Sequence, residues 1–375
     1  MKRKISVLFI VAIVMSLVIT GCGLNIGGGK TAKVAILAPL SGDVKTFGES
    51  TKNAAMMAIE EYDGFELEIV VEDSRCDAQE ATNAANKVIF DDEVSFILGA
   101  VCSSASIPIS EIAEANGVLQ ISPTSTNPAV TKNEDGTNKE FVFRACFTDP
   151  FQGEVMAAFA MDELGAKTAG VLYDVGNDYV KGLGEYFVQA FEERGGTIAV
   201  NEAYTKDDTD FSGVLGKVAA ADVDVLFLPD YYAKNNLIAA QIKEKGIDAI
   251  LLGGDGWDSP ELEFELFEGG YHSNHYSPAD PRPIVQDFVS GYEAKYGQTP
   301  DALATLGYDA AKMLFQAMDE ANSTDPEKVQ AALAEIEYEG VSGVITFDPF
   351  GTPIKSAAIV KIEGGKQVFH KFVAP

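Results

Sequence analysis

The stretch SFILGAVCSSASIPISEIAEANG, residues 95–117, decides the fold that the sequence predicts. A continuous apolar run ends at Cys102, Ser103 and Ser104, and a helical spacing of apolar residues begins at once. A buried strand that passes directly into a helix is the repeating unit of a parallel α/β sheet. The hydroxyl groups at the junction could be a nucleophile, a phosphate-binding loop or a grip on a smaller ligand.

The same strand and helix alternation runs through most of the chain, and a second series begins near Phe151. Continuous apolar strands between amphipathic helices predict an α/β fold of two Rossmann-like lobes with parallel sheets. Helices after Pro283 and a closing hairpin near residues 357–372 indicate a hinge that the chain crosses more than once. We expect lobe 1 to contain residues 32–147 and 278–345, and lobe 2 to contain residues 148–277 and 346–375. A ligand would bind in the cleft between them.

The N-terminus has the pattern of an export signal. Lys2, Arg3 and Lys4 precede an apolar run over residues 5–19, which is short for a membrane span of about 20 residues. The following ITGC resembles a bacterial lipobox, which implies that residues 1–22 are a lipoprotein signal with Cys22 as the lipidated residue. A plain secretory signal or a membrane anchor is the alternative. Residues 23–31 then form a flexible tether; they do not fit a P-loop, because Gly23 lies six residues before Gly29 where five are required.

Charge and cysteine usage fit an exported protein. The chain has 28 basic and 57 acidic residues, so no nucleic-acid partner is expected. Cys76 and Cys102 each follow an apolar strand-like run, and neighbouring parallel strands would bring them together as a disulfide. Closing this loop would contribute roughly 3.5 kcal/mol on the chain-entropy model. Cys146 would remain free and buried.

Catalytic and metal signals are weak. There is no G-x-S-x-G around Ser103, and the three histidines, His272, His275 and His370, lie far along the chain from it. We interpret His272 and His275 as ordinary polar residues, since on a strand their spacing would put them on opposite faces. The acidic run at residues 207–210 is interpreted as a solvated turn and helix cap, with a calcium-binding loop as the alternative. We therefore expect no enzyme activity, no cofactor and no metal.

Hydroxyl groups at strand ends are the better signal. Ser103 and the group Thr124, Ser125 and Thr126 follow two successive strands, where ligands of open parallel sheets bind. Helix N-termini at this edge could hold a small carboxylate, although helix capping alone is the simpler role.

The second half offers complementary groups at equivalent places. Tyr231 follows one strand, and Asp255 and Trp257 follow the next. A carboxylate there could pair with an ammonium group. The alternative role of Asp255 is that of a turn residue before Gly256.

Several segments in this order resemble the type I periplasmic binding proteins of the leucine/isoleucine/valine-binding family: VAILAPLSGDVKTFG, DDEVSFILGAVCSSAS, LQISPTSTNP, TKDDTDFSG and ILLGGDGW. The resemblance covers nearly all of the mature chain, and Cys76 and Cys102 match the family's disulfide. It implies a monomeric, extracytoplasmic substrate-binding component of an ABC importer, which delivers an aliphatic amino acid to a membrane permease. Alanine, an amide, urea or an aromatic acid is the alternative ligand, and sensing for a signalling receptor is the alternative role.

The resemblance also implies roles for individual residues. Ser103 and Thr126 match the residues that hold the ligand carboxylate, while the Thr124 carbonyl and Asp255 match the ammonium partners. Further contacts to the ligand are implied for Tyr231, Tyr179, Phe47, Trp257 and Leu303. Asp255 stands where the family often has Glu, and Trp257 and Leu303 depart from the family's pocket walls, so the ligand side chain is the least defined part.

Overall fold

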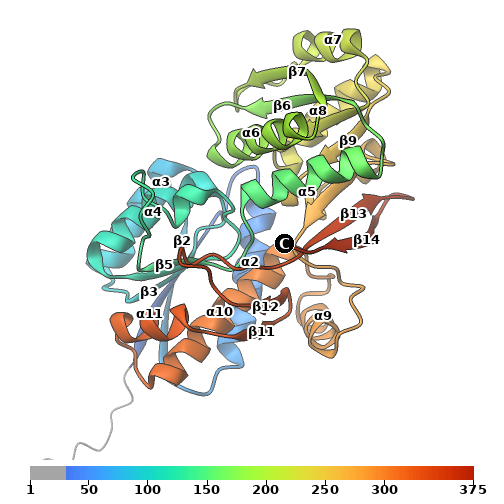
Figure 1. The fold of residues 1–375 in the computed structure, drawn as a ribbon. Coiled ribbons are helices and arrows are strands. Elements are labelled where there is room, and N and C mark those ends of the chain that lie inside the picture. The colour runs from blue at the N-terminus through green and yellow to red at the C-terminus, as the bar shows by residue number, and fades with distance from the viewer. Residues whose placement is uncertain (1–30) are drawn as a thin grey trace, which may run out of the picture.

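The computed structural model describes residues 31–375, which form two α/β lobes side by side (Figure 1). The predicted signal peptide, the predicted lipidation site Cys22 and nearly all of the predicted tether lie outside the described residues. Within residues 31–375, no helix is both long and apolar enough to cross a membrane. The predicted fold class of two lobes with parallel strands is confirmed.

The first lobe is built on a fully parallel sheet in the order β2-β1-β3-β4-β5. Helices α3 and α4 cover one face, and helices α2, α10 and α11 cover the other with aliphatic side chains. The strands are β1 (Ala32–Ala38), β2 (Leu67–Asp73), β3 (Phe96–Gly99), β4 (Leu119–Ser122) and β5 (Val142–Arg144). The helices are α2 (Lys45–Glu60), α3 (Ala78–Asn86), α4 (Ser103–Asn116), α10 (Ala302–Ala321) and α11 (Pro326–Ala334).

The second lobe has a mixed sheet in the order β14-β13-β10-β9-β8-β6-β7. The predicted closing hairpin supplies β13 and β14, which pair antiparallel with β10 and with each other. The strands are β6 (Thr168–Asp174), β7 (Thr197–Tyr204), β8 (Val225–Leu228), β9 (Ile250–Gly253), β10 (Tyr271–Asn274), β13 (Ala357–Ile362) and β14 (Gln367–Val373). Helices α5 (Asp149–Asp162) and α6 (Asp178–Glu193) cover one face, and α7 (Ser212–Ala221) and α8 (Tyr232–Lys245) cover the other.

Helix α9 (Pro283–Tyr296) and the small pair β11 (Tyr338–Gly340) and β12 (Gly343–Ile345) complete the described elements. Because α10 packs in the first lobe and β13 in the second, the chain passes between the lobes three times. Asp258 connects the second lobe to the start of α10 in the first lobe. Its carboxylate accepts hydrogen bonds from Asn274 Nδ2 at 2.8 Å, from the Ala302 N–H at 2.7 Å and from Gln367 Nε2 at 2.9 Å.

The junction of β3 and α4 depends on Gly99 and on a disulfide. Gly99 has φ +143°, and a Cβ at this position would lie 2.2 Å from the Leu37 carbonyl oxygen on β1, so only glycine fits. The predicted disulfide joins Cys76 to Cys102, with the Cα atoms 5.4 Å apart, and Cys146 is free and buried as predicted. The disulfide therefore fixes the residue that caps α4.

Candidate functional site

A cavity of about 300 Å³ lies between the two lobes, at the carboxyl ends of their strands. It is lined by Phe47, Val101, Cys102, Ser103, Thr124, Tyr179, Tyr231, Asp255, Gly256 and Leu303. Seven of the nine sequence-predicted ligand residues are in this lining. No Lys or Arg is among the lining residues, so any negative charge on a ligand must meet hydroxyl groups and backbone N–H groups.

The first lobe contributes the start of α4 and the loop after β4. Ser103 is the first residue of α4, and its Oγ accepts a hydrogen bond from the Asn127 N–H at 3.2 Å. The Ser103 hydroxyl proton is thus free to donate. Thr124 Oγ1 instead donates to the Val101 carbonyl oxygen at 2.7 Å. A helix N-terminus with a free hydroxyl is suited to a carboxylate.

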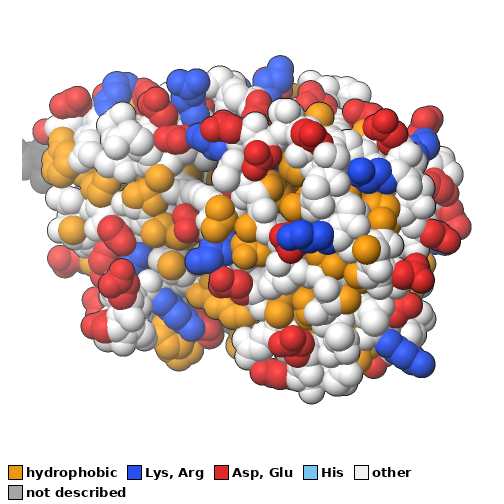
Figure 2. All heavy atoms as spheres, turned by 90° about the horizontal axis from the view of Figure 1, so that it is seen from above, with side chains coloured by type: hydrophobic (Ala, Val, Ile, Leu, Met, Phe, Trp, Pro, Cys, Tyr) orange, Lys and Arg blue, Asp and Glu red, His pale blue; other side chains and the backbone are white. Residues whose placement is uncertain are grey.

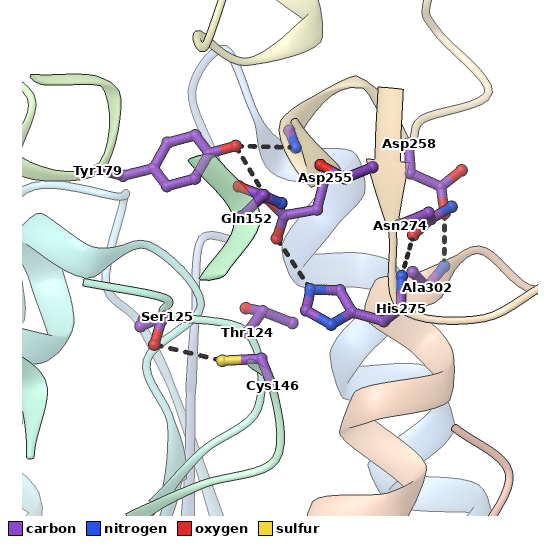
Figure 3. Close-up of polar contacts among 12 residues, drawn as sticks. Thr124, Ser125, Cys146, Gln152, Tyr179, Asp255, Asp258, Asn274, His275 and Ala302 are labelled. Carbon is purple, nitrogen blue, oxygen red and sulfur yellow. Dashed lines mark hydrogen bonds and ion pairs between the residues drawn. The ribbon is translucent and has the colours of Figure 1, made fainter. Parts of the chain in front are cut away.

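The second lobe contributes an ionised carboxylate. Figure 3 shows Asp255 between Tyr179 and Gln152 on one side and His275 on the other. Asp255 Oδ1 accepts from Tyr179 Oη and from Gln152 Nε2, both at 2.8 Å, and Oδ2 accepts from His275 Nε2 at 3.0 Å. Burial opposes the charged form of Asp255, but hydrogen bonds from these three groups outweigh it and lower its pKa.

The partner of Asp255 is neutral. Burial lowers the pKa of His275, although the neighbouring Asp255 carboxylate opposes this shift. Burial also raises the pKa of Tyr179 well above its ordinary value, so its hydroxyl remains a donor. Neutral donors therefore hold Asp255 as an anion without cancelling its charge, and it can pair with a ligand cation.

Aromatic rings close the cavity from both lobes. Tyr179 and Tyr231 stack with ring centroids 5.1 Å apart and an interplanar angle of 4°. Phe47, on α2 of the first lobe, meets Tyr231 edge-on at 5.6 Å and Tyr232 at 5.1 Å. These contacts give the cavity an aromatic wall, to which Leu303 adds aliphatic surface.

Hydrogen bonds on both sides of the cavity join the lobes, so the structure is a closed form. Thr46 Oγ1 donates to Tyr232 Oη at 2.8 Å, and Tyr232 Oη donates to the Asp43 carbonyl oxygen at 2.9 Å. On the other side, Asn127 Nδ2 donates to the Asp178 carbonyl oxygen, and the Asp178 N–H donates to Ser104 Oγ, both at 2.9 Å.

Two predicted site residues do not line the cavity. Trp257 is fully buried, donates its indole N–H to the Leu228 carbonyl oxygen at 3.0 Å and packs against Phe267. It supports the core beneath Asp255. Thr126 is also fully buried, and its carbonyl oxygen accepts from the Asp149 N–H at 3.0 Å.

Sequence reasoning missed Gln152 and His275. Gln152 lies one turn after Asp149 at the start of α5, which follows β5, so the strand-end signal used elsewhere could have found it. The interpretation of His275 as an ordinary polar residue instead of a metal ligand did not include its contact with Asp255. The alternation of faces along a strand does not apply to this pair, because β10 ends at Asn274 and only His272 lies on the strand.

Other candidates for a site contain fewer convergent groups. A hollow of about 770 Å³ beside α6 and β7 is lined by several glutamates and contains none of the predicted residues. Within residues 31–375 there is no group of three or more His, Cys, Asp or Glu side chains suited to a metal. On the face shown in Figure 2, Lys and Arg are scattered among acidic side chains.

Comparisons with known proteins agree with this geometry. Residues 31–367 match the family of periplasmic binding proteins. The chain is 31% identical over 333 residues to the leucine-, isoleucine-, valine-, threonine- and alanine-binding protein of Pseudomonas aeruginosa, covering 86% of this chain and 87% of the relative.

Solved structures give the same result. The leucine-binding protein LivK of Thermotoga maritima is 37% identical with a TM-score of 0.87, covering 92% of this chain and 99% of that one. LivJ of Streptococcus pneumoniae in complex with isoleucine is 26% identical with a TM-score of 0.84, covering 92% of this chain and 100% of that one. A benzoate complex from R. palustris, at 21% identity and a TM-score of 0.84, covers 92% of this chain and 97% of that one and shares the fold alone.

Proposed function

This chain belongs to the type I periplasmic binding proteins of the leucine/isoleucine/valine-binding family, and we propose that it binds an aliphatic amino acid for an ABC importer. The family is one of solute-binding proteins that work outside the cytoplasm. The relatives from Pseudomonas aeruginosa and Thermotoga maritima are named as leucine-binding proteins, the first also for isoleucine, valine, threonine and alanine.

The presence of Asp255 and of the start of α4 in the same cavity lining is the observation that supports this proposal most. An anion held by neutral donors lines one side of the cavity, and a hydroxyl at a helix N-terminus lines the other. This arrangement suits a zwitterion, whose ammonium and carboxylate groups need opposite partners. In the proposal, Asp255, Tyr231 and the Thr124 carbonyl oxygen hold the ammonium group, and Ser103 and Thr126 hold the carboxylate. Thr126 is fully buried and lies two residues after the lining residue Thr124.

The apolar part of the cavity sets the expected side chain of the ligand. Phe47, Val101 and Leu303 offer aliphatic and aromatic surface, without a buried polar group that would need a partner on the ligand. Leucine, isoleucine and valine fit this surface, and alanine is the next candidate. Trp257 acts in this proposal by supporting the loop that carries Asp255.

Closure of the lobes is the proposed binding mechanism. The polar groups proposed to bind the ligand lie at the carboxyl-terminal strand ends of both sheets, one sheet in each lobe. A ligand therefore makes its full set of contacts only in the closed form. Binding thereby shifts the equilibrium between open and closed forms toward the closed one. The permease would receive the ligand from this closed form.

Several finer features belong to the same proposal. Residues 32–147 with 278–345 and residues 148–277 with 346–375 would move as the two rigid bodies. Cys22 would carry the lipid anchor, and residues 23–31 would tether a monomer to the membrane.

Titration calorimetry tests this function. The protein lacking residues 1–22 keeps all the described residues; unfolding and refolding would strip bound ligand from it. We expect saturable binding of at least one of leucine, isoleucine, valine or alanine among all amino acids, small amides, urea and benzoate. Binding of an amide or benzoate alone would keep the fold and reject the amino-acid assignment.

A further inference from the structure

Asp149 is a buried carboxyl group at the seam between the lobes that the proposed site does not use. It is the first residue of α5, directly after the first passage between the lobes, and its side chain is fully buried. Neither carboxyl oxygen has a hydrogen-bond partner among the described residues. Burying a carboxylate that has no hydrogen-bond donor costs much free energy, and such a group usually becomes neutral by taking up a proton.

Groups from both lobes enclose this carboxyl. A Cβ built on Gly182 of α6 would lie 3.4 Å from Asp149 Oδ2 and 3.1 Å from Asn127 Nδ2 of the first lobe. Asn127 also donates across the seam to the Asp178 carbonyl oxygen. Parting the lobes breaks this contact and opens the seam to water, so the surroundings of Asp149 differ between the open and closed forms.

Thr126 connects Asp149 to the proposed carboxylate side of the cavity. The Asp149 N–H donates to the Thr126 carbonyl oxygen at 3.0 Å. The Thr126 hydroxyl lies close enough to lower the pKa of Asp149, yet its Oγ1 completes no hydrogen bond with a described residue. An ionised Asp149 would attract the Thr126 hydroxyl proton, whereas a protonated Asp149 can donate to Thr126 Oγ1 and leave that proton for a ligand carboxylate.

The surroundings of Asp149, above all its burial, favour the protonated form of its carboxyl group. Burial raises the pKa of Asp149 to about 8 in the closed form, and the Asp255 carboxylate adds to this, while Thr126 and the Arg144 guanidinium oppose it. Arg144 is itself engaged, since it donates to the carbonyl oxygens of Ser125 and Asn127. The other titratable groups near Asp149 remain neutral hydroxyl or thiol groups when burial raises their pKa: Cys146, Tyr179, Tyr186 and Tyr231.

We propose that Asp149 is a positioning residue for the ligand carboxylate, and that closure on a ligand takes up one proton from solvent onto its carboxyl group. The inference rests on the proposed function, because it needs a ligand carboxylate that reaches the Thr126 hydroxyl, which is buried without a partner two residues after the lining residue Thr124. A negatively charged Asp149 would place an unpaired anion beside the ligand carboxylate. A neutral Asp149 removes this repulsion and orients the Thr126 hydroxyl.

The sign of the pH dependence follows from the raised pKa. In the closed form Asp149 keeps its proton up to a pH of about 8, whereas in the open form it loses the proton above the ordinary pKa of a carboxyl group. Between these two values binding takes up a proton, so the ligand binds more tightly at lower pH. Affinity should weaken by up to about tenfold per pH unit as the pH rises toward about 8, and should then become constant.

Calorimetry in two buffers tests the proposal directly. Leucine, isoleucine or valine, whichever binds, is titrated at pH 6.5 in phosphate and in imidazole, which both buffer at this pH and whose ionisation enthalpies differ. The difference in observed enthalpy gives the number of protons taken up. We expect about one proton for the wild-type protein, and about none for Asp149→Asn, whose amide can donate to Thr126 Oγ1 at any pH.

The variant should also bind at least as tightly as the wild type at pH 7.5, with less than threefold change in Kd between pH 6 and 8. Asp162→Asn is the matched control: it removes the same charge from the exposed end of the same helix and should keep the proton uptake. No proton uptake by the wild-type protein overturns the proposal even if the variant fails to fold. Uptake that persists in folded Asp149→Asn also overturns it. Absence of any amino-acid binding to the wild type would instead reject the proposed function.

Discussion

Nε2 of His275 donates a hydrogen bond to Asp255 Oδ2 at 3.0 Å, and both side chains are buried. The imidazole also stacks on Phe147, with ring centroids 3.8 Å apart, so its orientation is fixed. His275 thus holds the carboxylate that we propose as the ammonium partner, from a position that does not line the cavity.

Substitution of His275 with Ala should weaken amino-acid binding by about tenfold or more, because a charge-assisted hydrogen bond to a buried carboxylate contributes about 1.5–3 kcal/mol. His275 lowers the pKa of Asp255, so its loss raises that pKa. The variant should therefore lose more affinity relative to the wild type at pH 5 than at pH 7.5. Calorimetry at both pH values checks this, with His370→Ala on the surface as the control; an equal loss at both values would contradict a role through Asp255.

Asp255→Ala should reduce affinity more than tenfold, since it removes the anion that faces the ligand ammonium. Asp255→Asn keeps the shape of the side chain and should lose a similar amount, because the charge is what matters. The dissociation constants from calorimetry compare the two variants with the wild type. An unchanged constant in Asp255→Ala would exclude this residue as the ammonium partner.

The double variant C76S/C102S should lower the free energy of unfolding by about 3–4 kcal/mol, as expected for a loop of this size. The bond joins the end of the β2 region to the residue that caps α4. Urea denaturation measures the change. C146S, which retains the disulfide, should stay within about 1 kcal/mol because a hydroxyl can replace the thiol contact to the Ser125 carbonyl oxygen.

Leu314→Ala should lower the free energy of unfolding by about 2–5 kcal/mol, since Leu314 is 1% exposed in the contact between α10 and the first sheet. Leu237 is the matched control: it is also a helical leucine, but it is 44% exposed. Leu237→Ala should change the stability by less than about 0.5 kcal/mol. Equal losses in urea denaturation would contradict the assigned core.

Strand-end reasoning predicted much of the fold and the site. Parallel strands are read from continuous apolar runs, and their carboxyl ends share one edge, so Ser103, Thr124, Tyr231 and Asp255 can be grouped from the order of residues alone. The addition of β13 to β10 was less predictable, because a hairpin does not specify which sheet edge it joins.

Contacts between distant loops could not be predicted in the same way. His275 meets Asp255 only because β10 ends one residue earlier and the chain turns toward the neighbouring strand end. The position of Trp257, two residues after Asp255, favours a place in the cavity wall. The short 3₁₀ turn Asp255–Trp257 points its ring into the core instead.

The late position of α10 affects how the chain can mature during export. Sheet β1–β5 is complete once residue 144 has left the membrane, but α10, which packs against α2 and one face of that sheet, ends at residue 321. The apolar side chains of Ala55 and Ala58 on α2 therefore lack their packing partners on α10 until nearly the whole chain is available for folding. A chain that ends before α10 would leave these apolar side chains exposed to solvent, which favours aggregation.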